Sequence, residues 1–282
     1  MTGAEPVRLN ASFVAAPSGN LFCIARAPAG DAARGCVFLL PPFAEELNKS
    51  RHMMALAARH FAAAGWHVRM ADLFGCGDSA GDFADATWDG WLEDLVQLAT
   101  EARRSSGGVL WLWALRSGAL FVPALLEHMP DAQVLLWQPV LSGRQMLTQF
   151  LRLKAAADML GEAPRVGANQ LRENLLQGGE SIEVVGYALS AELARGLDRA
   201  AWGVPGTFEG RVVWIEVAQG EAAGPTPASE AQIERLRAAG IRVDASAVAG
   251  AAFWQTSEIA ECPELIARSL AMLDAEPSVA LP

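Results

Sequence analysis

The stretch Val109-Leu-Trp-Leu-Trp-Ala-Leu-Arg-Ser-Gly-Ala-Leu120 decides how this sequence is interpreted. Its first half is a continuous apolar run, typical of a strand buried on both faces, and its second half is compatible with a helix. The small residues Ala114 and Gly118 flank the point where the two halves meet. This is the layout of a nucleophile elbow, a tight strand-to-helix turn that presents one reactive side chain between two small residues.

Arg116 occupies the position that the nucleophile takes in such an elbow. A guanidinium stays protonated at any accessible pH and has no lone pair with which to attack. We therefore expect the scaffold of an elbow without its usual chemistry. A guanidinium can instead hold a carboxylate or a phosphate through two parallel hydrogen bonds, so Arg116 is a predicted ligand-binding residue.

Two acidic residues, Glu45 and Glu46, follow Pro41-Pro42 in a segment that we expect to form a loop beside the elbow. We predict that one of them pairs with Arg116 across the floor of a pocket, and that Lys49 and Arg51 add positive charge there. The sequence leaves two interpretations open: an internal ion pair that closes the pocket, or a site for an acidic ligand. Either carboxylate would also serve as a general base if its surroundings raised its pKa.

Strands and helices alternate along most of the chain, which predicts an α/β protein with a mostly parallel, twisted sheet flanked by helices. We expect strands at residues 13–27, 35–40, 66–70, 109–113, 134–137, 211–217 and 241–248, and helices at residues 50–64, 88–104, 118–128, 229–239 and 263–273.

Residues 142–201 interrupt this alternation with charged, helical sequence that contains no convincing strand. An insertion at this point is expected to form a helical cap over the carboxyl ends of the strands, where α/β proteins bind ligands. Extra helices on the side of the sheet are the alternative. The core then comprises residues 1–141 and 202–276, and residues 277–282 form a disordered tail.

Composition limits the partners of the chain. The net charge of −10 over 282 residues provides no basic surface for nucleic acid. The four cysteines are scattered, as in a reduced, cytoplasmic protein, and the four histidines lack metal-ligand spacing. The N-terminus has no signal-peptide pattern, and Arg116 interrupts the most apolar segment, so we expect no membrane insertion. We expect a small acidic or acyl ligand and neither cofactor nor metal, and the sequence allows a homodimer.

The order of elements, with the elbow after the central strand and the insertion before the penultimate strand, resembles the α/β-hydrolase fold. Six short strings, taken in their order, resemble one branch of that superfamily, the exosortase A system-associated hydrolases of type 2. They are Pro41–Arg51, Asp72–Gly81, Leu115-Arg-Ser-Gly118, Gln138-Pro-Val140, Gly186–Ser190 and Phe253-Trp254. The resemblance spans approximately residues 37–273. It implies a hydrolase-family protein of a bacterial exopolysaccharide and protein-sorting pathway, acting on an acyl, ester or acidic glycosyl-type molecule. Within these strings we expect ligand contacts from Phe43, Lys49, Leu115, Arg116, Gln138 and Trp254.

A Ser-His-Asp hydrolase needs a histidine after its last strand, and that histidine is missing. The loop reads Ala249-Gly-Ala-Ala-Phe-Trp-Gln255, and no histidine follows His128, although Glu221 stands near the position of the acid. We therefore expect an unconventional site with Glu45, Glu46 and Ser117 as candidate catalytic residues. The alternatives are a catalytically inactive ligand-binding or assembly protein, and an esterase whose nucleophile is Ser117, one residue beyond the elbow position.

Overall fold

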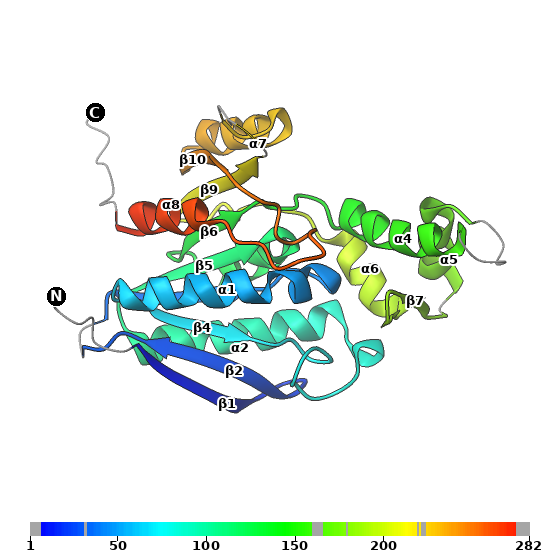
Figure 1. The fold of residues 1–282 in the computed structure, drawn as a ribbon, viewed down its shortest axis with the longest axis horizontal. Helices are drawn as coiled ribbons and strands as arrows, with labels where there is room; N and C mark the ends of the chain where they lie inside the picture. The colour runs from blue at the N-terminus through cyan, green and yellow to red at the C-terminus, as the bar shows by residue number, and fades with distance from the viewer. Residues whose placement is uncertain are drawn as a thin grey trace.

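A computed structural model describes residues 7–30, 33–159, 166–178, 180–218, 220 and 224–274 of the chain. Its centre is one sheet with the strand order β1-β2-β4-β3-β5-β6-β9-β10. The pairs β1–β2 and β2–β4 are antiparallel, and all other neighbours are parallel. The mostly parallel sheet flanked by helices that the sequence predicts is confirmed (Figure 1).

The strands of the sheet are β1 (Arg8–Ala16), β2 (Gly19–Ala27), β3 (Gly35–Leu40), β4 (His67–Ala71), β5 (Val109–Leu115), β6 (Gln133–Trp137), β9 (Arg211–Ala218) and β10 (Arg242–Ala249). The helices packed around it are α1 (Glu45–Ala63), α2 (Trp88–Ser106), α3 (Val122–His128), α7 (Pro227–Ala238) and α8 (Pro263–Asp274), with short 3₁₀ segments η1 (Phe83–Asp85) and η2 (Arg116–Phe121).

Helices α1 and α8 lie together on one face of the sheet, and α2 lies on the other (Figure 1). The core beneath α1 and α8 is aromatic: the rings of Trp113 and Trp137 meet edge-on at 4.7 Å, and Phe61 of α1 packs against both. The indole Nε1 of Trp137 donates to Ser269 Oγ at 2.8 Å, which satisfies a donor that burial would otherwise leave unpaired. The strands therefore hold α1 through ring packing and α8 through this hydrogen bond.

Three of the predicted elements are wrong in their limits. The helix predicted at residues 118–128 is a 3₁₀ segment as far as Phe121 and an α-helix only from Val122. Residues 13–27 form a hairpin rather than one strand, because the chain turns at Pro17-Ser18 and Ala16 pairs with Gly19. Helix α1 begins at Glu45, five residues earlier than predicted. Glu45 and Glu46 are thus its first turn and not a loop, where their negative charges interact favourably with the helix dipole.

The insertion between β6 and β9 contains α4 (Gly143–Met159), α5 (Ala168–Gly178), α6 (Ala191–Arg199) and a hairpin of β7 (Ile182–Val184) and β8 (Tyr187–Leu189). The expectation that it lacks strands is wrong. The hairpin turns through Val185 and Gly186, both with positive φ, as a two-residue turn between twisted strands requires. An isolated bridge between Ser142 and Ala201 joins the two ends of the insertion.

The predicted tail at residues 277–282 lies outside the described residues. Within the part of the chain that the structure describes, no helix is both long and apolar enough to cross a membrane.

Asp94 of α2 is a fully buried carboxyl group with one oxygen satisfied. Its Oδ1 accepts from the Ser18 N–H at 3.0 Å, whereas Oδ2 has no partner among the described residues. Burial raises the pKa of Asp94. The pKa of Asp94 is therefore higher in the folded state than in the unfolded state. Its contribution to the stability of the fold is fully present below the unfolded pKa, where the group is protonated in both states. That contribution is lost as the pH rises through the folded pKa and Asp94 ionises in its buried position.

We therefore expect Asp94→Asn to raise the free energy of unfolding at neutral pH by about 1 kcal/mol, because the amide keeps an acceptor for Ser18 and carries no charge. The gain should shrink as the pH is lowered towards the unfolded pKa of an aspartate. Urea denaturation across this range measures it, with Glu127→Gln, at an exposed position on α3, as the control. If Asp94→Asn raised the free energy of unfolding equally at every pH, the raised pKa of Asp94 would not be its cause.

Candidate functional site

The turn after β5 has the geometry of an elbow. Arg116 adopts a φ of +54°, which is uncommon for a residue other than glycine and is found where surrounding structure holds a strained turn. Gly118 packs so tightly on the end of β3 that an added Cβ would lie 2.1 Å from the Leu40 carbonyl oxygen. Ala114 is fully buried. Gly118 is therefore needed for the close passage of the chain, and Ala114 lies in the buried core on the other side of Arg116.

The Arg116 guanidinium is held on three sides. Its Nη2 donates to Glu46 Oε1 at 3.0 Å, and its Nε donates to the same carboxylate at 3.2 and 3.3 Å. Its Nη1 donates to the backbone oxygen of Gln138 at 3.3 Å. The guanidinium carbon also lies 5.3 Å from the centre of the Trp254 ring, in cation–π contact. The predicted pairing of Arg116 with one of the two glutamates is confirmed, and the partner is Glu46.

This ion pair is largely removed from water, since the side chains of Arg116 and Glu46 are only 11% and 14% exposed. Burial raises the pKa of Glu46, and the positive charge and hydrogen bonds of Arg116 offset part of that rise. The ionised state of Glu46 therefore depends on Arg116.

A cavity of about 600 Å³ opens above the pair, between the first turns of α1, the elbow, α4 and the loop after β10. It brings together six of the predicted site residues: Phe43, Glu45, Glu46, Lys49, Arg116 and Trp254. Sequence reasoning missed Gln255 and the wall that α4 supplies, which consists of Met146, Gln149, Phe150, Arg152 and Leu153. The apolar members of that wall repeat at helical spacing, a signal that could have identified the face of α4 over the site.

Four other residues do not line this cavity. Leu115 is fully buried in the core, and Ser117 is 2% exposed. Gln138 contacts Arg116 only through its backbone, while its side-chain Oε1 accepts from the Val217 N–H at 2.7 Å. Arg51, which the sequence places with Lys49, lies on the other side of α1 and pairs with Asp72. Of these, Gln138 acts on the site indirectly, because it helps to hold Arg116.

No metal-binding arrangement accompanies the cavity. Within the described ranges, no three His, Cys, Asp or Glu side chains converge on a place for a metal ion. None of the four histidines lines the cavity, and His52 pairs with Glu261 at 2.6 Å on the surface.

Searches with the sequence match no family model and no curated protein. Solved structures do resemble the chain. Est1E from Butyrivibrio proteoclasticus is 15% identical, with 93% of this chain and 97% of that chain covered and a TM-score of 0.62. XC6422 from Xanthomonas campestris, described as an α/β serine hydrolase without lid, is 15% identical, with coverage of 96% and 98% and a TM-score of 0.55. Naproxen esterase from Bacillus subtilis is 13% identical, with coverage of 95% and 93% and a TM-score of 0.54.

This chain has the α/β-hydrolase fold. The fold assigns a functional position to the elbow, to the loop after the last strand and to the loop after β3, whose backbone N–H groups stabilise an oxyanion in hydrolases. Arg116 occupies the elbow, and Trp254 lies in the loop after β10. The N–H of Phe43, in the loop after β3, donates to Ser117 Oγ at 2.8 Å.

In hydrolases of this fold the catalytic acid follows the penultimate strand, which corresponds to β9 in this chain. Glu221, the residue that the sequence suggests, lies outside the described residues. The buried Glu216, near the end of β9, accepts hydrogen bonds from the Thr226 N–H at 2.7 Å, from Trp214 Nε1 at 3.2 Å and from Ser229 Oγ. These contacts tie Glu216 to the start of α7 and not to the cavity.

We expect Arg116→Ala to lower the free energy of unfolding by about 3 kcal/mol at neutral pH, because it leaves the Glu46 carboxylate buried without its cation. Loss of the cation raises the pKa of Glu46 further, so the penalty should fall as the pH is lowered and Glu46 takes up a proton. Arg116→Lys should recover only part of the loss, since an ammonium cannot make the paired contacts of a guanidinium.

Chemical denaturation of the single variants and of Arg116→Ala/Glu46→Gln measures this coupling. The double variant should be more stable than Arg116→Ala alone, because no unpaired charge remains. An Arg116→Ala protein as stable as the parent, or a double variant no better than the single one, would show that the pair does not hold the site.

Proposed function

We propose that the chain binds a small amphipathic anion, an acyl-type molecule with an acidic group, in the cavity above Arg116, and that it does not carry out Ser-His-Asp acyl transfer. One observation carries this proposal. A guanidinium stacked on an indole and bonded to Glu46 occupies the place where that chemistry needs a nucleophile beside an imidazole.

The charges of the cavity support an anionic ligand. Arg116 is neutralised by Glu46, and Lys49 lies 3.5 Å from Glu45. Arg152, on the exposed surface of α4, makes no ion pair with the residues that the structure describes, so it can bind an anionic group.

The apolar wall of the cavity supports the acyl part. Met146, Phe150 and Leu153 of α4 face the same space as Arg152. An acyl chain would therefore lie along α4, with its head group at the rim. On this basis we propose that residues 142–201 act as a cap on a core of residues 1–141 and 202–276.

A second candidate function is hydrolysis by a water molecule that Glu46 activates. The raised pKa of Glu46 and its place in the cavity favour this function, because a general base works best with a pKa near the operating pH. The bonds from Arg116 weigh against it, since they occupy both oxygens of the carboxylate.

The third alternative, an esterase that uses Ser117, is the least supported. The Ser117 hydroxyl is buried and already accepts the Phe43 N–H, and no histidine lines the cavity to activate it.

The pathway and the cellular location of the protein are also proposals. The resemblance in sequence supports a role in an exosortase A-linked exopolysaccharide pathway, and four buried, unpaired cysteines support a cytoplasmic location. The homodimer that the sequence allows stays a prediction.

We expect no covalent adduct when the folded protein is treated with a fluorophosphonate probe and its intact mass is measured, because no hydroxyl among the described residues lines the cavity beside a base. An active serine esterase in a parallel reaction controls for the reagent. A single adduct that disappears in Ser117→Ala would overturn the proposal and establish the esterase.

We expect decanoate to bind at the cavity and Arg152→Glu to weaken its affinity by about tenfold, the effect of losing roughly 1.4 kcal/mol of interaction. Isothermal titration calorimetry measures both, and Arg268→Glu on the exposed surface of α8 is the control for the same change of net charge. Equal weakening by the two variants would contradict a head-group site at Arg152. Hydrolysis of p-nitrophenyl decanoate that Glu46→Gln abolishes would support the second candidate instead.

A further inference from the structure

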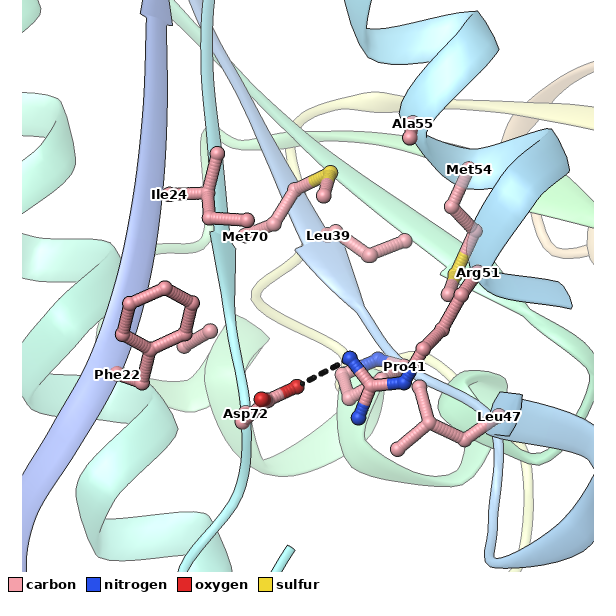
Figure 2. A pocket seen from close by; sticks show the side chains of 11 residues that line it. Phe22, Ile24, Leu39, Pro41, Leu47, Arg51, Met54, Ala55, Met70 and Asp72 are labelled. Atoms are coloured by element: carbon pink, nitrogen blue, oxygen red, sulfur yellow. Dashed lines mark hydrogen bonds and ion pairs between the residues drawn. The ribbon is translucent and has the colours of Figure 1, made fainter. Parts of the chain in front are cut away.

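A second cavity, of about 210 Å³, lies on the other side of α1, between this helix and strands β2, β3 and β4 (Figure 2). It shares no lining residue with the cavity above Arg116. Its walls are Phe22 and Ile24 of β2, Leu39 and Pro41 at the end of β3, Met70, Ala71 and Asp72 at the end of β4, and Leu47, Arg51, Met54 and Ala55 of α1.

All but two of these residues are apolar, and the cavity is partly open to solvent, with the Arg51 side chain at its edge 42% exposed. An apolar cavity of about 150 Å³ in another protein stays free of water and binds benzene or xenon. The cavity beside α1 is larger and is lined by the same kinds of side chain. Its size and surface therefore suit a small apolar molecule better than ordered water.

The polar end of the cavity is a neutral ion pair. Arg51 Nη1 donates to Asp72 Oδ1 at 2.8 Å, as the dashed line in Figure 2 shows, and Asp72 Oδ2 accepts from the Asp78 N–H at 3.2 Å. Gly77, with a φ of +56°, closes over the pair, since a Cβ at this position would lie 1.9 Å from Asp72 Oδ2. The loop thus keeps Asp72 in place beneath Arg51.

Arg51 keeps a donor for a further group. Its Nη2 has no hydrogen-bond partner among the described residues, and its Nε reaches Asn48 Oδ1 only at 3.5 Å. Because Asp72 already neutralises the guanidinium, an anion placed here would meet a carboxylate with no excess positive charge to balance it. An uncharged oxygen is the group that the free donor suits.

We propose that this cavity is a ligand site for a small uncharged molecule, a ring or branched chain about the size of benzene, whose one oxygen accepts a hydrogen bond from Arg51. Phenol has this chemistry. The site is separate from the cavity above Arg116 and does not depend on the function proposed for it.

Methyl NMR of the full chain with ¹³C-methyl methionine tests the proposal, because Met54 and Met70 line the cavity and their neighbour Met53 does not. Met→Leu variants assign the three signals, and Met146 reports on the other cavity. We expect phenol to shift the Met54 and Met70 signals saturably, benzene to do so with lower affinity, and benzoate to leave them unchanged. Shifts that do not saturate, shifts confined to Met146, or tighter binding of benzoate than of phenol would overturn the proposal.

Two variants test the volume and the polar end. Ala55→Leu fills the cavity and should weaken phenol binding at least about tenfold, whereas Ala63→Leu, at the exposed end of the same helix, should not. Arg51→Met/Asp72→Asn removes the ion pair without leaving a lone buried charge and should reduce the affinity for phenol to that for benzene. Unchanged phenol affinity in Ala55→Leu would refute the site, and if that variant does not fold, the titration of the parent protein decides alone.

Discussion

A cation on a strained turn at the centre of a fold needs a counter-charge beside it, and the ion pair between Arg116 and Glu46 meets this need. The backbone fixes where the guanidinium stands, because Gly118 presses the elbow against the end of β3. Helix α1 must then begin at the point where its first turn can present Glu46. The Trp254 ring closes the third side. Elements distant in the sequence therefore converge on one charge.

The α/β-hydrolase fold and the chemistry of its site are separate properties in this chain. The elbow, the loop after β3 and the loop after β10 lie where the fold puts them, but each makes a contact within the protein: the ion pair of Arg116, the Phe43–Ser117 hydrogen bond and the cation–π contact of Trp254. Solved structures with 15% identity or less share the architecture, and a fold of this kind hosts many activities. The fold alone therefore does not determine what the cavity of this chain binds.

The sequence predicts the parts of the fold that depend on local pattern. The apolar run of β5 and the small residues around Arg116 identify the elbow, because sterics at that turn allow little else. The sequence does not predict the hairpin β7–β8, because a strand of three residues is too short to show the alternation of apolar and polar residues. The start of α1 is mispredicted for another reason. Acidic residues such as Glu45 and Glu46 are typical of the first turn of a helix, but the prolines that precede them indicate a loop.

The site is only partly visible in the sequence, because its walls come from tertiary packing. Pairing of Arg116 with a glutamate follows from charge and position, but the choice of Glu46 over Glu45 depends on the direction in which the first turn of α1 faces. Arg152 and the cavity beside α1 depend on how whole elements pack. Contacts between elements that are distant in the sequence do not produce a local sequence motif.

The bond between the Phe43 N–H and the Ser117 hydroxyl has a consequence for any attempt to install a serine nucleophile in the elbow. A serine placed at position 116 would face an indole where it needs an imidazole, and its oxyanion donor would already be occupied by a neighbouring hydroxyl. Replacing Arg116 alone would also leave the buried Glu46 carboxylate without its cation. Serine chemistry in this scaffold would therefore need changes at the elbow, in the loop after β3 and in the loop after β10 together.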